Sequence, residues 1–140
     1  MDDECIFCSS GAATNVAIGA TQCTDCNPGS YSEGGAMQCS VCPPGTSSES
    51  FSSKCEDCMP GWSAPSSGSA ACVACAAGSY TPTLRSTSCE TCHIGRAQAA
   101  AGQQECVPCS AGQFASASSQ ATCTNCASGG HNQDLFFFLK

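Results

Sequence analysis

The stretch that decides the fold is Cys23-Thr24-Asp25-Cys26-Asn27-Pro28-Gly29-Ser30-Tyr31-Ser32, and the next cysteine follows at Cys39. It holds two cysteines separated by two residues, a glycine three residues after the second cysteine, and then a short polar loop. The same unit recurs along the whole chain at a nearly constant spacing. This regularity predicts a tandem array of eight small modules. The modules begin at Cys5, Cys23, Cys39, Cys55, Cys72, Cys89, Cys106 and Cys123.

A glycine stands six residues after the first cysteine of every pair. Its fixed place predicts either a positive φ or a neighbouring backbone too close for a Cβ. Proline precedes it in modules two, three and four, which fits a type II turn. Aromatic residues follow it in four modules, at Tyr31, Trp62, Tyr80 and Phe114, and we expect these rings to pack over disulfides. The predicted turn glycines are Gly11, Gly29, Gly45, Gly61, Gly78, Gly95, Gly112 and Gly129.

Cysteine takes the place of an ordinary hydrophobic core. Only 16 of the 140 residues are Leu, Ile, Val or Phe, and another 16 are Cys. Fewer than about 20% of the former cannot usually offset the ordering entropy, whereas more than about 8–10% cysteine marks a disulfide scaffold. The loops are rich in Ser, Ala, Gly and Thr and show no helical period. We therefore predict a small disulfide-rich repeat protein, an elongated rod with short β-hairpins, turns and little or no helix. In such a stack each module contacts only its neighbours.

Three kinds of cysteine chemistry fit paired cysteines: disulfides, zinc sites with four thiolates, and redox-active pairs. Zinc modules usually carry cations and histidines nearby, and a thioredoxin-like motif needs a βαβ context that the sequence lacks. We favour disulfides and expect no metal and no cofactor. A zinc-binding scaffold stays as a third hypothesis.

Two disulfide pairings fit the spacing. The interlocked scheme joins Cys5 to Cys23 and Cys8 to Cys26, and so on, and it uses all the cysteines. It would clamp only alternate loops, although the glycine occurs in every loop, so we favour the other scheme without excluding this one. In the zipper scheme each loop of about 15 residues gains roughly 3 kcal/mol on closure. The zipper pairs are Cys8–Cys23, Cys26–Cys39, Cys42–Cys55, Cys58–Cys72, Cys75–Cys89, Cys92–Cys106 and Cys109–Cys123.

The zipper leaves Cys5 and Cys126 over, one toward each end of the array. A leftover cysteine in a secreted protein predicts pairing outside the unit. Its partner would come from flanking sequence or from another copy of the chain. A head-to-tail contact between copies generates an open filament unless it closes into a ring.

The repeat resembles a known family. The motif from Cys23 to Cys39, and Cys39-Ser40-Val41-Cys42-Pro43-Pro44-Gly45-Thr46 after it, are similar to the ephrin-receptor-like cysteine-rich repeat. That family is a relative in style of EGF-like and tumour-necrosis-factor-receptor modules. The resemblance covers residues 5 to about 129, although modules one and six lack the proline and the aromatic residue. It implies an elongated, disulfide-stapled extracellular rod, and it implies no enzyme.

The charge and the ends of the sequence restrict the partners. A net charge of −7 argues against nucleic acid and anionic membrane surfaces. We divide the chain into an acidic end (1–4), the repeats (5–129) and an apolar tail (130–140). The apolar run of the tail is far shorter than the roughly 20 residues that span a bilayer. We interpret it as a candidate interface with a neighbouring repeat or another copy, or as a non-native end. That run is Leu135, Phe136, Phe137, Phe138 and Leu139.

No catalytic constellation stands out, since His93 and His131 have no positioned acid or nucleophile beside them in the sequence. The hydroxyl-rich segments 46–48 and 116–119 are candidate O-glycan acceptors. We predict an extracellular structural protein, a rod or filament building block of a cell surface, matrix or appendage. Its partners would be other protein chains, including copies of itself. The alternative is a ligand-binding ectodomain fragment of a cell-surface receptor.

Overall fold

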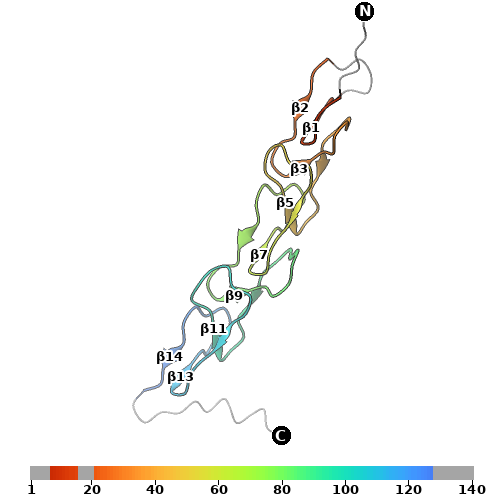
Figure 1. The fold of residues 1–140 in the computed structure, drawn as a ribbon. Coiled ribbons are helices and arrows are strands. Elements are labelled where there is room, and N and C mark those ends of the chain that lie inside the picture. Colours follow the sequence, from red (N-terminus) through yellow and green to blue (C-terminus); the bar gives the residue numbers. More distant parts are fainter. Residues whose placement is uncertain (1–6, 16–20, 128–140) are drawn as a thin grey trace, which may run out of the picture.

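The computed structural model describes residues 7–15 and 21–127, and over these residues the chain forms a thin, elongated rod (Figure 1). Its regular structure consists of fourteen two-residue strands paired in seven antiparallel hairpins. No helix occurs in these two ranges. The predicted disulfide-rich rod of short hairpins and turns is therefore confirmed.

Each hairpin is shared between two modules. One strand follows the glycine of a module, and its partner lies between the two cysteines of the next module. Ser30 thus faces Val41, and Tyr31 faces Ser40. The pairs are β1 (Ala12–Ala13) with β2 (Thr24–Asp25), β3 (Ser30–Tyr31) with β4 (Ser40–Val41), β5 (Thr46–Ser47) with β6 (Glu56–Asp57), β7 (Trp62–Ser63) with β8 (Val73–Ala74), β9 (Ser79–Tyr80) with β10 (Glu90–Thr91), β11 (Arg96–Ala97) with β12 (Val107–Pro108), and β13 (Gln113–Phe114) with β14 (Thr124–Asn125).

The core is a column of sulfur and small side chains. The second cysteine of each of the first six pairs is at most 1% exposed, and alanines such as Ala13 and Ala64 are fully buried beside them. No aliphatic side chain larger than alanine belongs to the buried set of the described residues. The disulfides therefore fill the space that Leu, Ile and Phe fill in an ordinary domain, as the composition predicts.

Backbone hydrogen bonds continue from module to module. The N–H of Gly45 donates to the carbonyl of Ala64 at 2.8 Å, and the N–H of Ala64 donates to the carbonyl of Ser86 at 3.0 Å. The carbonyl of Gly45 accepts from the N–H of Cys58 at 3.0 Å. Equivalent bonds recur along the rod, so the loops stay ordered although their composition is that of a linker.

The expectation that each module contacts only its neighbours is wrong. The repeat glycine of one module lies against a loop carbonyl two modules further along the chain. A Cβ on Gly61, for example, would overlap the carbonyl oxygen of Gly102. The reason is that each loop folds back toward the N-terminal end and passes over the intervening module. The five contacts join Gly11 to Phe51, Gly29 to Gly68, Gly45 to Arg85, Gly61 to Gly102, and Gly78 to Ser119.

Candidate functional site

The disulfides are the most regular feature of the structure. They join the second cysteine of each pair to the first cysteine of the next, from Cys8–Cys23 to Cys109–Cys123, which is the zipper pairing. Their Cα–Cα distances are 5.6 to 5.7 Å, within the usual range. Each disulfide closes the base of one shared hairpin. It therefore adds a second covalent link between two modules that the backbone already joins.

Of the two cysteines that the zipper pairing leaves over, the structure describes only one. Cys126 is half-buried and is the free cysteine of the described residues, whereas Cys5 lies outside them. The fourteen bonded cysteines are not thiolates that could bind zinc. The described ranges also contain no cluster of three His, Cys, Asp or Glu residues suited to a metal.

The repeat glycines hold the geometry of each junction. Gly61 has a φ of 88°, in the left-handed region that glycine adopts without strain. The other repeat glycines from Gly11 to Gly112 have φ values near it, and Gly129 lies outside the described residues. Both reasons that the sequence suggested for a glycine apply at Gly61: the positive φ and the approach of a neighbouring backbone.

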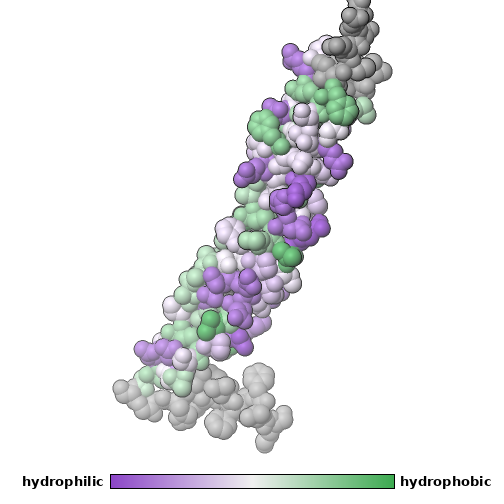
Figure 2. Space-filling model, in the orientation of Figure 1, coloured by the Kyte–Doolittle hydropathy of each residue, from purple (hydrophilic) through white to green (hydrophobic). Residues whose placement is uncertain are grey.

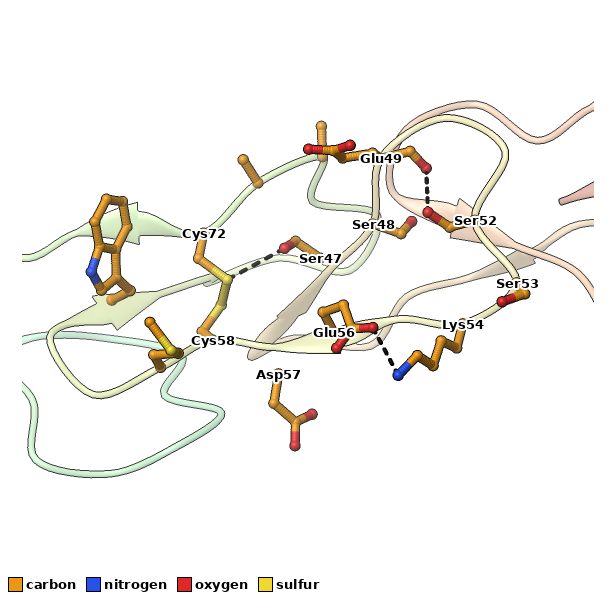
Figure 3. Close-up of a pocket in the computed structure, with 14 residues that line it drawn as sticks. Ser47, Ser48, Glu49, Ser52, Ser53, Lys54, Glu56, Asp57, Cys58 and Cys72 are labelled. Atoms are coloured by element: carbon orange, nitrogen blue, oxygen red, sulfur yellow. Dashed lines mark hydrogen bonds and ion pairs between the residues drawn. A yellow bond between two sulfur atoms is a disulfide. The ribbon is translucent and has the colours of Figure 1, made fainter.

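An open groove of about 450 Å³ lies where modules three and four meet (Figure 3). The Cys58–Cys72 disulfide crosses it, and the Ser47 hydroxyl lies 3.4 Å from the Cys72 sulfur. Met59 and Trp62 bring apolar surface to the groove, and they are 66% and 40% exposed. Hydroxyls and charged groups line the other end. The groove thus combines an exposed indole with polar groups that can donate and accept hydrogen bonds.

The charged groups of this region are paired at the surface. Lys54 Nζ lies 2.9 Å from Glu56 Oε1, and this hydrogen bond raises the pKa of the Lys54 ammonium. Arg85 Nε lies 3.4 Å from Asp57 Oδ1. Both pairs are well exposed, so each contributes little to the free energy of folding. They leave Glu49 without an ion pair among the described residues of the groove.

A second groove, of about 410 Å³, occupies the equivalent place between modules six and seven. Its walls are Ala97 and Gln98, Val107 and Pro108, and Cys123. These positions correspond to those of the first groove counted from the repeat glycine and the cysteines. The grooves are therefore a property of the repeat, while the exposed indole distinguishes the one between modules three and four.

Exposed apolar side chains are distributed along the rod. Figure 2 shows hydrophobic and hydrophilic residues interleaved on the visible face, without one large apolar area. Val41, Val73 and Val107, each between the cysteines of a pair, are 58% to 65% exposed. Scattered exposure of this kind is normal and by itself identifies no binding site.

Two of the aromatic residues that were expected to pack over disulfides have described contacts with other residues. The indole of Trp62 borders Gly102, and the hydroxyl of Tyr80 donates to Glu90 at 2.9 Å. That hydrogen bond raises the pKa of Tyr80. None of the described contacts tests the expected packing of rings over disulfides, which stays a prediction. The candidate interface at residues 135–139 lies outside the described residues.

The candidate O-glycan acceptors divide into two groups. Thr46 and Ser48 are 2% and 4% exposed, and their hydroxyls donate to the backbone carbonyls of Pro43 and Ser30. The structure therefore argues against these two hydroxyls as acceptors, because a sugar would need space and would remove a hydrogen-bond donor. Segment 116–119 is exposed throughout.

Sequence reasoning missed the contacts between second neighbours. A signal was present, because Gly35, Gly68 and Gly102 each stand four residues before a cysteine and each has a positive φ. In other modules this loop position is Phe51, Arg85 or Ser119, also with a positive φ. Phe, Arg and Ser do not favour a positive φ, so the sequence did not indicate that this loop position has the same conformation in every module.

Comparison of the sequence with known protein families gives a match. The family model described as tyrosine-protein kinase ephrin type A/B receptor-like matches residues 95–135. No curated protein matches the chain. The match and the seven disulfides both point to an extracellular or cell-surface location. The seven disulfides in tandem modules of one pattern fit the ephrin-receptor-like cysteine-rich repeats that the family model matches at residues 95–135.

Proposed function

We propose that the chain is an extracellular spacer or filament building block with no catalytic activity of its own. The observation that carries this proposal is the contact between modules two apart, which recurs at five repeat glycines. Each of modules one to five is held to the next by a shared hairpin and a disulfide, and to the one after by this contact. Bending the rod at any of these junctions would have to open all three links.

The energetics of the fold suit a spacer. Stability is distributed as local links between modules rather than concentrated in one hydrophobic core. An extracellular rod has to keep its length under load, and covalent closure of every module serves that purpose. A catalytic or small-ligand site would instead need an enclosed, mostly apolar pocket. Both grooves described above are open to solvent.

Shape in solution tests the spacer. Small-angle X-ray scattering of the oxidised chain should give a rod whose longest dimension is several times its cross-section. The Gly61→Ala, Gly78→Ala double variant should bend or shorten it while its disulfides remain intact by peptide mapping. A compact wild-type particle would exclude the spacer.

Head-to-tail assembly is a finer part of this proposal. It rests on Cys126, whose position in the last described module leaves it half-buried and unbonded among the described residues. Non-reducing electrophoresis should show a ladder of multimers that disappears in Cys126→Ser and, separately, in Cys5→Ser. A monomer in which Cys126 is bonded to Cys5 of the same chain would contradict a filament.

A receptor-like ectodomain is the second candidate, and the repeated grooves favour it. The groove with Trp62 and Met59 offers an aromatic anchor with a polar rim, which is the composition of many protein-binding hot spots. Staining of cells with an oligomerised form of the chain tests this function. Trp62→Ala should abolish staining, and Val73→Ala, a matched exposed residue, should not. If the unmodified chain does not stain cells either, the result favours the spacer.

A further inference from the structure

The two residues between the cysteines of a pair change character from one module to the next. From module two to module seven, these residues carry a carboxylate in every even-numbered module and no charge in any odd-numbered one. They form one strand of each shared hairpin, so acidic and uncharged hairpins alternate along the rod. The acidic pairs are Thr24–Asp25, Glu56–Asp57 and Glu90–Thr91, and the uncharged pairs are Ser40–Val41, Val73–Ala74 and Val107–Pro108.

The contacts between second neighbours arrange the modules in two rows. Modules two, four and six are joined by the contacts of Gly29 with Gly68 and of Gly61 with Gly102. Modules one, three, five and seven are joined in the same way through the loop residues Phe51, Arg85 and Ser119. The rows are called the even row and the odd row below. Each is held together by direct backbone contact.

The uncharged hairpins border the even row, and an acidic one borders the odd row. A Cβ on Gly68 would lie 3.4 Å from the Val41 side chain. A Cβ on Gly102 would lie 3.8 Å from that of Ala74. Asp57 occupies the same place in its cysteine pair, but its Oδ1 lies 3.4 Å from Nε of Arg85, which belongs to the odd row. Apolar and acidic side chains therefore accompany different rows of modules.

Exposed apolar side chains recur along the even row. Val41, Val73 and Val107 are 58%, 65% and 58% exposed. Trp62 faces Ala74 across the hairpin of β7 and β8, and its Nε1 would lie 3.5 Å from a Cβ on Gly102. Each of these side chains alone is ordinary for a surface, but together they recur at every second module on one row. Val41, Trp62, Val73 and Val107 are called the apolar edge below.

The distribution of charge favours a second copy, in antiparallel orientation, as the partner of this edge. The described residues up to residue 70 include five carboxylates and one lysine, whereas those from residue 71 onward include two carboxylates and two arginines. Two antiparallel copies would therefore place the acidic half of each chain against the half without net charge. Parallel copies would place the two acidic halves together, which like-charge repulsion disfavours.

The two ends of the even row also carry complementary charges. Glu33 is exposed and stands two residues before Gly35, on which the Phe7 ring lies. Arg96 is exposed at the other end and faces Pro108 across the hairpin of β11 and β12. An antiparallel copy would bring the carboxylate of one chain to the guanidinium of the other, twice in each dimer.

We propose that two copies of the chain pair side by side in antiparallel orientation along the apolar edge, with Val41 of each copy against Val73 of the other. The spacing suits this register, because Phe7 precedes Val41 by as many residues as Val73 precedes Val107. Such an isologous contact closes on itself and gives a dimer. It goes beyond the spacer and the head-to-tail filament, since it joins rods laterally and uses no cysteine.

Sedimentation velocity of the oxidised full chain tests the edge. A Cys5→Ser, Cys126→Ser background excludes covalent joining, and in it the chain should form a reversible, concentration-dependent dimer. Val41→Asp combined with Val73→Glu should raise the Kd of this dimer at least about tenfold, because like charges would meet across the edge. The variant should still fold, since acidic residues already occupy the equivalent positions of the even-numbered modules. Intact mass should confirm its seven disulfides.

The matched control is Thr24→Glu combined with Thr91→Asp. It adds the same two charges at the equivalent positions of the acidic hairpins, so the Kd should change less than about threefold. If the charged edge variant does not oxidise fully, Val41→Thr combined with Val73→Thr takes its place, because threonine occupies both positions in even-numbered modules. It should raise the Kd at least about threefold through the loss of apolar contact.

Reversal of charge tests the orientation. Glu33→Arg should raise the Kd at least about threefold, because it would place two cations together at each end of an antiparallel dimer. The further change Arg96→Glu in the same chain should restore the original Kd. In a parallel dimer each residue would face its own copy, so Glu33→Arg would not weaken the association.

Three outcomes would overturn the proposal. A chain that stays monomeric at every concentration would exclude the dimer. Equal changes in Kd for the edge variant and its threonine control would exclude the apolar edge as the contact. An unaltered or lower Kd in Glu33→Arg would exclude the antiparallel orientation.

Discussion

The carbonyl oxygen of Gly102 lies against the α-carbon of Gly61, two modules nearer the N-terminus, and leaves no room for a Cβ between them. The N–H of Gly102 donates to Cys75, and the carbonyl of Gly61 accepts from the N–H of the same Cys75. The three residues come from modules four, five and six. One buried cysteine therefore connects a repeat glycine with the loop that covers it, and this arrangement recurs along the rod.

The first prediction separates close approach from backbone strain. Gly61→Ala and Gly112→Ala both place alanine at a left-handed φ, of 88° and 80°. Only the first would also push a Cβ into a described carbonyl, that of Gly102. We expect a loss of stability of about 1–2 kcal/mol for Gly112→Ala and of about 3 kcal/mol or more for Gly61→Ala. Amide exchange around each site measures both losses. Equal losses would mean that the second-neighbour contact contributes nothing.

The second prediction concerns the position of a disulfide. Replacing Cys58 and Cys72 by alanine opens a loop of sequence separation 14 in the middle of the rod. The chain-entropy model gives a loss of roughly 3 kcal/mol for such a loop. The modules on both sides should remain folded, because each contacts its own neighbours. Limited proteolysis should therefore cut within modules four and five and release two resistant halves.

The control for that prediction is the terminal pair Cys109 and Cys123, whose loop has the same sequence separation. Its removal should leave one long resistant fragment that lacks only the last modules. If either double variant became sensitive along its whole length, the modules would unfold as a single cooperative unit.

Most of the fold could be predicted from the spacing of cysteine and glycine. A nearly constant interval between cysteine pairs, a shortage of large apolar residues and loops without helical period leave few alternatives to a stapled rod. The pairing of the cysteines is harder to predict from the sequence, since both the zipper and the interlocked scheme satisfy the spacing. What separates them is the shared hairpin, which brings Cys26 next to Cys39, and strands of two residues carry almost no signal in the sequence.

The contacts between second neighbours leave only a partial signal in the sequence, because they are made by backbone atoms. Phe51, Arg85 and Ser119 adopt a positive φ that their side chains disfavour, and the hydrogen bonds of the surrounding modules impose it. The burial of two hydroxyl side chains could not be predicted from the sequence either. Thr46 and Ser48 belong to a serine-rich stretch that resembles a solvated linker, yet both side chains are buried and donate to backbone carbonyls.

The third prediction concerns alkaline pH. The hydrogen bond from Tyr80 to Glu90 raises the pKa of the phenol above its ordinary value of 10.0. Because the folded-state pKa is the higher one, the contribution to stability is complete below pH 10 and is lost as the pH rises through the folded pKa. Glu90→Ala should lower the pKa of Tyr80 toward 10. Glu90→Gln retains an acceptor and should lower it less. Titration of the Tyr80 ring by NMR measures the change, and an unaltered pKa in Glu90→Ala would contradict the assignment.

The fourth prediction places O-linked glycan by exposure. If the chain is modified in a secreting cell, sugar should be found on the exposed Ser116 or Ser118 and not on Thr46 or Ser48. The buried hydroxyls donate to carbonyls at 2.7 and 3.0 Å, and attachment of a sugar would remove these donors and require space that the packed side chains of Thr46 and Ser48 do not have. Glycopeptide mapping of the oxidised protein locates the sites. Glycan on Thr46 or Ser48 of folded protein would show that these modules open before modification.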